Sequence, residues 1–263
     1  MINDKNWDVP AYEPLIWTGK KHDACVVIPV INEGSRITSL LAKISNLNIT
    51  DIADIIIVDG GSTDGSLQKD RLLELGVTGL ILKTGPGKLS AQLRCGYAFV
   101  LKEGYKNIVT IDGNDKDDPA PIPEFIAALD KGYDFVQASR FVKGGVAVNT
   151  PKSRDFAIKY IHAPVLSMAS GFRWTDTTQG FRAYSSKMLL DERVAPFRDI
   201  FNTYELLAYL SYIAPKLGFQ CIELPTSRIY PEGEVPTKIS SFSGNLSVLK
   251  ILFKACLGHY NPR

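Results

Sequence analysis

The chain has 263 residues, of which 45% are apolar and 22% are charged, the ordinary composition of a soluble globular protein. The 30 Lys and Arg residues nearly balance the 28 Asp and Glu residues, so the net charge of +2 does not favour nucleic acid as a partner. The 4 cysteines and 3 histidines are scattered, which argues against a disulfide framework or a histidine-rich zinc site and indicates a reduced, cytoplasmic protein.

Residues 1–23 are mostly polar, and we expect them to form an extension ahead of the folded domain. They lack the apolar core of a signal peptide. No run of about 18 apolar residues occurs in the chain, so the sequence predicts no membrane-spanning helix.

Apolar runs alternate with helical patterns through the first half of the chain. The runs predict buried strands at residues 24–30, 55–58, 79–83 and 108–111. Helical spacing predicts a helix after the turn at residues 32–34, another after a glycine-rich turn whose Thr63 or Asp64 caps it, and a third at about residues 89–102. This alternation predicts an α/β fold with a parallel sheet covered by helices on both faces.

Polar side chains stand where three of these strands end. Asn32 and Glu33 follow the first strand, Asp59 ends the second, and Asp112 follows the fourth. Because the carboxyl ends of parallel strands meet at one edge of a sheet, we expect these residues to converge on one ligand-binding crevice. For each residue taken singly, an Asx turn or a helix cap is the alternative.

Four aspartates follow the last of these strands within seven positions, at Asp112, Asp115, Asp117 and Asp118. Their mutual repulsion favours a bound cation, and Mg²⁺ or Mn²⁺ takes such oxygen ligands together with water and substrate phosphates. A solvated acidic turn that caps a helix starting near Pro121 is the alternative.

Six short segments, in matching order, give the chain a resemblance to a known family. Residues 28–33 (IPVINE) resemble the PxxNE signature of family 2 glycosyltransferases, residues 58–65 (VDGGSTDG) their VDDGSxDGT turn, and residues 112–119 (DGNDKDDP) their DxD motif. Residues 138–145 (ASRFVKGG), 175–184 (TDTTQGFRAY), and Arg228 with residues 236–240 (PTKIS) are similar to segments of the dolichyl-phosphate mannosyltransferase-like branch.

The resemblance implies a GT-A fold, which is a Rossmann-like, mostly parallel α/β sheet, over residues 24–242. The nucleotide-binding half would cover about residues 24–119 and the acceptor half about residues 120–242. The sequence contains neither the dinucleotide-binding fingerprint GxGxxG after the first strand nor the P-loop motif GxxxxGK[ST].

The resemblance also implies a donor site for a nucleotide diphosphate sugar at the strand ends. It places Pro29, Glu33 and Asp59 around the base and ribose, with Asn32 on the same rim. Further candidates for nucleotide binding, which could equally be solvated helix residues, are Lys88 and Arg94.

The DxD-like segment implies a site for the diphosphate and a metal ion. Asp112, Gly113 and Asn114 would contact the diphosphate, and Asp112 with Asn114 would ligate Mg²⁺ or Mn²⁺. Asn114 stands where the family carries a second acid, and Gly60 likewise replaces the second acid of VDDGS. Losing one charge should weaken the metal site, so Asp115 as a substitute ligand and a cation-independent enzyme are the alternatives.

Negative charge grows on the diphosphate leaving group as its bond to the sugar breaks, and preorganised positive charge lowers that barrier. Candidates inside the family-like segments are Arg140, Arg182, Arg228 and Lys238. We expect Arg154 to be a solvated surface residue. Lys238 belongs to a loop rich in Pro and Gly, which the resemblance implies closes over the donor.

The acceptor decides whether a general base is needed. A hydroxyl acceptor requires one, and Asp176 and Glu205 are the candidates, whereas a phosphate acceptor is already ionised. Asp176 could instead orient its loop or hold Arg182, and Glu205 could be a plain helix carboxylate.

The C-terminal segment, residues 243–263, carries a helical pattern at residues 246–257. Its apolar positions suit a helix packed on the core, and its lysines also suit an amphipathic helix in peripheral contact with the cytoplasmic membrane face.

The sequence therefore predicts an inverting glycosyltransferase that moves a sugar from a nucleotide diphosphate sugar to a polyprenyl phosphate. A saccharide or other glycan hydroxyl is the alternative acceptor. From other classes of protein, a sugar nucleotidyltransferase and a catalytically inactive nucleotide-sugar-binding module are the alternatives. The oligomeric state stays open.

Overall fold

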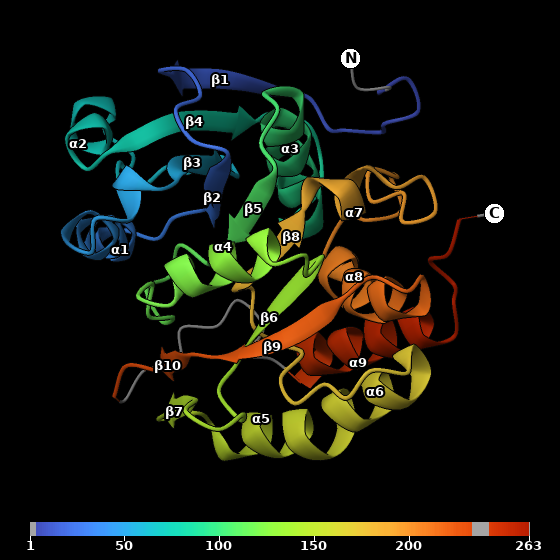
Figure 1. Ribbon diagram of the computed structural model, residues 1–263. Helices are drawn as coiled ribbons and strands as arrows, with labels where there is room; N and C mark the ends of the chain where they lie inside the picture. Colours follow the sequence, from blue (N-terminus) through green and yellow to red (C-terminus); the bar gives the residue numbers. More distant parts are fainter. Residues whose placement is uncertain (1–3, 233–241, 263) are drawn as a thin grey trace.

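The computed structural model of the protein describes residues 4–232 and 242–262. Within these ranges an eight-stranded sheet runs through the centre of the molecule (Figure 1). Its strands, in spatial order, are β1 (Tyr12–Trp17), β4 (Val77–Lys83), β3 (Asp54–Asp59), β2 (Ala24–Val30), β5 (Asn107–Thr110), β8 (Arg182–Ser185), β6 (Phe135–Ser139) and β9 (Cys221–Pro225). Strands β4, β3, β2 and β5 are mutually parallel, and β1 and β8 are antiparallel to their neighbours.

Helices cover both faces of this sheet, and alternate residues of its central strands are therefore buried on opposite sides. In β2, Cys25 and Val27 pack into one apolar cluster, and Val26, Ile28 and Val30 pack into the other. The first face carries α3 (Leu89–Lys102), α6 (Ala163–Ser170), α8 (Glu205–Lys216) and α9 (Phe242–Cys256). The second carries α1 (Ser35–Asn46), α2 (Lys69–Glu74) and α4 (Ile122–Asp130).

Shorter elements complete the described chain. They are the helices η1 (Ile49–Asp51), α5 (Lys152–Ala157) and α7 (Ser186–Leu190), the π-helical turn η2 (Ile158–His162), and a separate parallel pair of strands, β7 (Val146–Val148) and β10 (Ser227–Ile229). The segments α5, η2 and α6 follow one another without a break.

The predicted α/β architecture is confirmed, and each predicted strand of the first half lies within two residues of an observed one. The extra length of β3 and β4 comes from buried residues at their ends, such as Asp54 and Val77. The predicted helix near Pro121 is α4, which begins at Ile122 with Pro121 as its N-cap residue.

The boundary predicted after residue 23 is wrong, because the N-terminal segment is part of the domain. Strand β1 pairs antiparallel with β4 and forms an edge of the main sheet. Trp7 stacks on Phe197 with ring centroids 3.9 Å apart. The antiparallel pairing was missed because β1 contains a proline and only one buried residue, Ile16.

The cap predicted for the second helix is also wrong. Helix α2 begins at Lys69 and has no side-chain cap. Asp64 instead accepts hydrogen bonds from the backbone N–H of Ser66 at 3.1 Å and of Gly34 at 2.8 Å. Its carboxylate therefore holds the turn after β3 to the turn after β2.

Helix α9 packs on the core through Ile251, Leu252 and Ala255, in agreement with the core-packing alternative. Leu246 and Leu257 of the C-terminal segment remain exposed. Among the described residues, none of the helices has the length and apolar character that crossing a membrane requires.

Candidate active site

The turns after β2 and β3 form one rim of the predicted crevice. Asn32 adopts a left-handed backbone (φ 51°) and accepts a hydrogen bond from Thr63 N at 2.7 Å. Asp59 accepts from the backbone N–H groups of Gly61 at 3.1 Å and Ser62 at 2.8 Å. Asn32 and Asp59 thus lie side by side as predicted, and both stabilise the rim.

A pocket of about 450 Å³ opens beside this rim. Its walls come from the turn after β3, including Asp59 and Ser62, and from the neighbouring strands, including Leu15 of β1 and Leu80 of β4. Strand β1 contributes to this pocket, although the sequence predicts that its residues form an extension ahead of the domain.

Glu33 and Pro29 stand beside the same rim. Glu33 is buried and accepts from the guanidinium of Arg36, with Nη2 at 2.9 Å. Pro29 supplies a carbonyl oxygen to the backbone N–H of Gly113 at 3.4 Å. A Cβ atom on Gly113 would collide with Val30 and with the Pro29 carbonyl, so glycine allows the acidic turn to approach β2 this closely.

The acidic turn after β5 disperses its four carboxylates. Asp115 points to α1, where it accepts from Ser39 Oγ at 2.7 Å and pairs with Lys43 at 2.8 Å. Asp118 accepts from the backbone N–H of Ala120 at 3.0 Å. Asp117 is buried and pairs with the guanidinium of Arg228. Much of the repulsion expected in this cluster is therefore relieved by the protein's own cations.

Asp112 is a second acid of this turn that lies beside Arg228, and it is partly exposed. Its side chain is 22% exposed, and its Oδ2 lies 3.6 Å from Arg228 Nη2. Gly180 packs directly behind it, since a Cβ there would overlap the Asp112 carboxylate. Burial alone would lower the pKa of Arg228, but Asp117 and Asp112 together raise it, so the guanidinium stays charged.

A metal ion at this turn would depend on few protein ligands. Within the described residues no three His, Cys, Asp or Glu side chains gather as a ready-made metal centre. Asp112 offers a partly exposed carboxylate. The Oδ1 of Asn114 accepts a 3.2 Å hydrogen bond from Lys116 N. These two oxygens fit Mg²⁺ or Mn²⁺, which commonly use one or two protein oxygens plus phosphates and water.

The short strand β10 brings cations to this turn from distant parts of the sequence. It pairs with β7 on one side, and on the other it bridges to Asp117, with Ile229 N donating to Lys116 O at 2.8 Å. Tyr230 follows directly, and its phenol oxygen accepts from Arg154 Nη1 at 3.0 Å. The prediction that Arg154 is a solvated surface residue is therefore wrong.

Three cations surround the ring of Tyr230. Lys116 Nζ lies 5.2 Å from the ring centroid, and the guanidinium carbons of Arg228 and Arg154 lie at 5.7 Å and 5.9 Å. Burial alone would raise the pKa of the phenol, but Arg228 and Arg154 outweigh it and lower the pKa to about 8. We call this group, Lys116, Arg154, Arg228 and Tyr230, the cation cluster.

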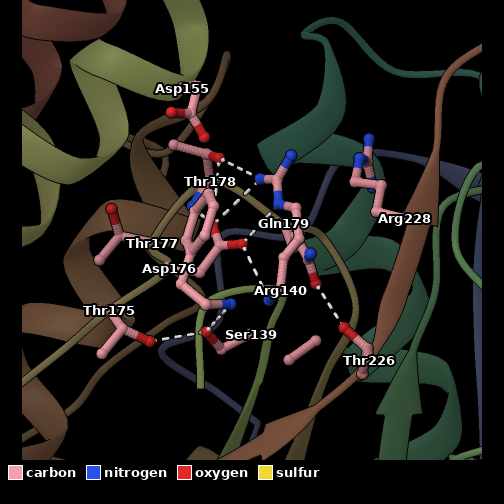
Figure 2. Close-up of polar contacts among 12 residues, drawn as sticks. Ser139, Arg140, Asp155, Thr175, Asp176, Thr177, Thr178, Gln179, Thr226 and Arg228 are labelled. Atoms are coloured by element: carbon pink, nitrogen blue, oxygen red, sulfur yellow. Dashed lines mark hydrogen bonds and ion pairs between the residues drawn. The ribbon is translucent and has the colours of Figure 1, made fainter. Parts of the chain in front are cut away.

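A buried ion pair stands beside the cation cluster (Figure 2). Arg140 donates to Asp176 from Nε at 2.7 Å and from Nη2 at 3.2 Å, and both side chains are almost completely buried. Glu223 of β9 accepts from the backbone N–H groups of Thr175 and Asp176 and so fixes the loop that carries Asp176. Asp176 holds Arg140, not Arg182 as one alternative had it.

Two of the predicted site residues, Arg182 and Arg94, have structural roles. Arg182 is buried and donates to the Gln179 and Thr177 carbonyls and to Ser211. Arg94 donates to Asn202 and to the carbonyl of Asp8, which ties the N-terminal segment to α3. These contacts disfavour direct phosphate binding by either arginine.

Glu205 is the first residue of α8, where its Oε2 accepts from Asn202 N at 3.1 Å and Thr203 N at 2.6 Å. This arrangement matches the alternative of a helix carboxylate. Lys88 is exposed at the N-terminal end of α3. Lys238 lies outside the described residues, so its role stays a prediction.

Tyr230, Glu223 and Gly180 were missed by the sequence reasoning. Tyr230 and Arg228 occupy the same short segment, so the family-like motif that identified one could have drawn attention to the other. Glu223 carries no motif signal, because its partners are backbone groups some 47 positions away.

Comparison with known proteins shows the family of this chain. Residues 25–193 match the model of a family described as glycosyl transferase family 2. A dolichyl-phosphate hexose transferase of Haloferax volcanii is 30% identical over 242 residues, which cover 89% of this chain and 94% of that protein. A polyprenol monophosphomannose synthase of Mycolicibacterium smegmatis is 25% identical over 232 residues, which cover 87% of this chain and 84% of that protein.

Solved structures show a similar fold. Glucosyl-3-phosphoglycerate synthase from Mycobacterium tuberculosis, in complex with Mn²⁺, UDP-glucose and phosphoglyceric acid, superposes with a TM-score of 0.60. The two chains are 16% identical, and the match covers 91% of this chain and 80% of the other. At this identity the likeness bears on the fold alone.

Proposed function

Because the chain belongs to glycosyl transferase family 2, we propose that it transfers a sugar, with inversion, from a nucleotide diphosphate sugar to a polyprenyl phosphate. Two relatives of similar length carry names that specify dolichyl-phosphate hexose transfer and polyprenol monophosphomannose synthesis, and both align over most of the chain. This proposal places the reaction at the cytoplasmic membrane face.

The observation that carries the proposal is the cation cluster beside Asp112. Arg154 and Arg228 come from the acceptor half of the chain, and Arg228 reaches to 3.6 Å from Asp112. Arginine is suited to bidentate contact with phosphate oxygens. A phosphate acceptor bound by these side chains would sit next to the turn that faces the donor diphosphate.

Both candidate bases already interact with other groups of the protein, which supports a phosphate acceptor over a hydroxyl acceptor. Asp176 is buried in its pair with Arg140, and Glu205 accepts backbone hydrogen bonds at the start of α8. Neither carboxylate is placed to remove a proton from an incoming hydroxyl, a step that requires contact with that hydroxyl. A phosphate oxygen attacks without such assistance because it is already ionised.

Exposed apolar side chains on the helical segment that carries Arg154 support a lipid acceptor. Phe156, Tyr160 and Met168 lie on the continuous segment α5–η2–α6 and are 58%, 68% and 79% exposed. Arg154 belongs to the same segment, two positions before Phe156. A lipid phosphate could place its head group at Arg154 and its chain along this apolar surface.

The donor would lie across the strand ends. The pocket beside Asp59 and Ser62 would take the base and ribose, and the diphosphate would reach Asp112. Asp112 and Asn114 would hold Mg²⁺ or Mn²⁺, which neutralises charge on the leaving diphosphate. Arg228, held in place by Asp117, adds a fixed positive charge at the same end of the crevice.

A transfer assay tests the proposal. The protein would be incubated with UDP-, GDP- and TDP-hexoses, with and without Mn²⁺, and with a short-chain polyprenyl phosphate. Polyprenol without the phosphate and a free hexose serve as matched acceptors. We expect glycosylation of the polyprenyl phosphate alone, in a product whose anomeric configuration is opposite to that of the donor. Transfer to polyprenol or to the free sugar would instead establish the hydroxyl-acceptor alternative.

A thermal-shift panel with the same nucleotides separates donor binding from turnover, since a ligand that binds only the folded protein stabilises it by about 2.7 kcal/mol at a hundredfold excess over its Kd. Stabilisation by a nucleotide without donor hydrolysis or transfer would establish the inactive binding module. The family assignment leaves the nucleotidyltransferase alternative without support.

A further inference from the structure

The backbone of Tyr230 is anchored at the junction between β7 and the end of β10. Its N–H donates to the Val148 carbonyl at 3.1 Å, and its carbonyl accepts from Asn149 Nδ2 at 3.2 Å. The residue is only 2% exposed, so the groups packed around the ring confine it.

The phenol joins cations from three separate elements. Arg154 belongs to α5, Arg228 to β10 and Lys116 to the acidic turn. Asp117 and Asp112 balance part of this charge, and both act on Arg228. For Arg154, the phenol oxygen at 3.0 Å is a direct partner that is neutral at low pH.

We propose that Tyr230 is a positioning residue for the acceptor phosphate: its neutral phenol holds Arg154 beside Arg228, and its ionised form competes with the phosphate for those cations. The inference rests on the proposed function and concerns the same site. The phenolate oxygen and a phosphate oxygen offer the same kind of anionic acceptor to a guanidinium, so the two states exclude each other energetically.

The proposal predicts that phosphate binding and ionisation of the Tyr230 phenol oppose each other. The pKa of Tyr230 is lowered to about 8, so the phenol is neutral below this pH and ionises above it. A bound phosphate adds negative charge to the cation cluster and must raise that pKa, and by reciprocity ionisation must weaken phosphate binding. Among the residues that the structure describes, the charged groups that face the ring are Lys116, Arg154 and Arg228, with Asp112 and Asp117 behind Arg228.

The first experiment follows tyrosinate absorbance as the full-length protein is titrated. Burial raises the pKa of several other tyrosines, including Tyr97, Tyr105 and Tyr184, so an early step can be distinguished from them. We expect a one-tyrosine step near pH 8 that disappears in Tyr230→Phe and persists in Tyr133→Phe, which removes the same hydroxyl from the turn after α4. Inorganic phosphate should move the step to higher pH, and chloride at equal ionic strength should not. A step unmoved by phosphate overturns the inference.

The second experiment measures the KM for polyprenyl phosphate against pH. In the parent protein we expect this KM to rise by up to about tenfold per pH unit above the pKa of the phenol, because a single ionisation opposes phosphate binding. In Tyr230→Phe the KM should be raised several-fold at neutral pH and should lack this alkaline rise, while the donor KM stays near the parent value. An alkaline rise that persists unchanged in Tyr230→Phe contradicts the inference.

The two proposals fail separately. Absence of transfer to any polyprenyl phosphate would overturn the proposed function, and the inference about Tyr230 is then decided by the titration with inorganic phosphate. Transfer that proceeds normally, together with a phosphate-insensitive titration, would overturn the inference and leave the proposed function intact. Tyr230→Phe keeps the ring against its cations, and the titration of the parent protein decides the matter even if that variant folds poorly.

Discussion

Arg140 and Asp176 form a buried, two-point ion pair, with Nε 2.7 Å from Oδ2 and Nη2 3.2 Å from Oδ1. Their motifs make both residues candidates for substrate chemistry, and the structure joins them to each other (Figure 2). Their pairing fixes the 175–178 loop against the end of β6, because Thr178 Oγ1 also accepts from Arg140 Nη2 at 3.1 Å. We therefore expect substitutions at Arg140 or Asp176 to affect mainly the stability of the site.

Asp176→Ala should destabilise the fold strongly, since it leaves the charge of Arg140 buried without its partner. Breaking such a pair typically costs about 3–5 kcal/mol. Urea unfolding measures the loss, and a double-mutant cycle with Arg140→Met should show strong coupling because the apolar pair removes both charges. A stable Asp176→Asn variant that has lost all transfer would instead indicate a general base.

Asp112→Asn should reduce transfer by orders of magnitude while the fold stays intact, because Asp112 is partly exposed and Arg228 keeps Asp117 as a partner. Mn²⁺ binding measured by calorimetry should weaken in parallel. Asp115→Asn is the matched control: its carboxylate pairs with Lys43, and its activity should stay within about twofold of the parent, a difference below 1 kcal/mol. A large loss in Asp115→Asn would show that this acid replaces Asn114 at the metal.

Asn114→Asp should tighten Mn²⁺ binding, because it adds a negative charge to the oxygen that stands next to Asp112 in the proposed ligand set. We expect a decrease in Kd of about tenfold, equivalent to about 1.4 kcal/mol. Calorimetry on the purified variant gives this directly, and Asn114→Gln, which keeps the amide, serves as the neutral comparison. An unchanged Kd would place the metal away from this side chain.

Gly180→Ala should lower activity by displacing Asp112 and should barely alter the apolar core. The added Cβ would overlap the Asp112 carboxylate, which must move from its place beside Arg228. We expect a loss of transfer comparable to that of Asp112→Asn, with a midpoint of thermal unfolding that falls by only a few degrees. Normal turnover in Gly180→Ala would mean that Asp112 has room to readjust without cost.

Glu205→Ala should cost about 1 kcal/mol of stability, because its carboxylate satisfies two backbone N–H groups at the start of α8. The kcat should remain near the parent value. The Glu205→Gln variant retains one acceptor oxygen and should recover part of the stability. A kcat reduced by about a hundredfold or more in both variants would restore Glu205 as a general base.

Local sequence patterns were sufficient for much of the fold. The run of residues 24–30 is apolar at every position, and such a run is stable only when both faces of a strand are covered, which implies helices on each side. The polar residues at its end had then to lie on the same edge as Asp59 and Asp112. Strand β1 escaped this reasoning because an antiparallel edge strand carries no such continuous apolar signal.

Local patterns in the sequence specify the class of each element, the edge of the sheet where polar groups gather, and the acids of the turn after β5. Only the folded chain shows which side chains meet: Arg140 with Asp176, Arg228 with Asp112 and Asp117, and Arg154 with Tyr230. The physical reason is the range of the two kinds of interaction. Periodicity and strand ends are properties of neighbouring residues, whereas an ion pair between positions 111 residues apart, such as Asp117 and Arg228, exists only after the strands between them have been placed.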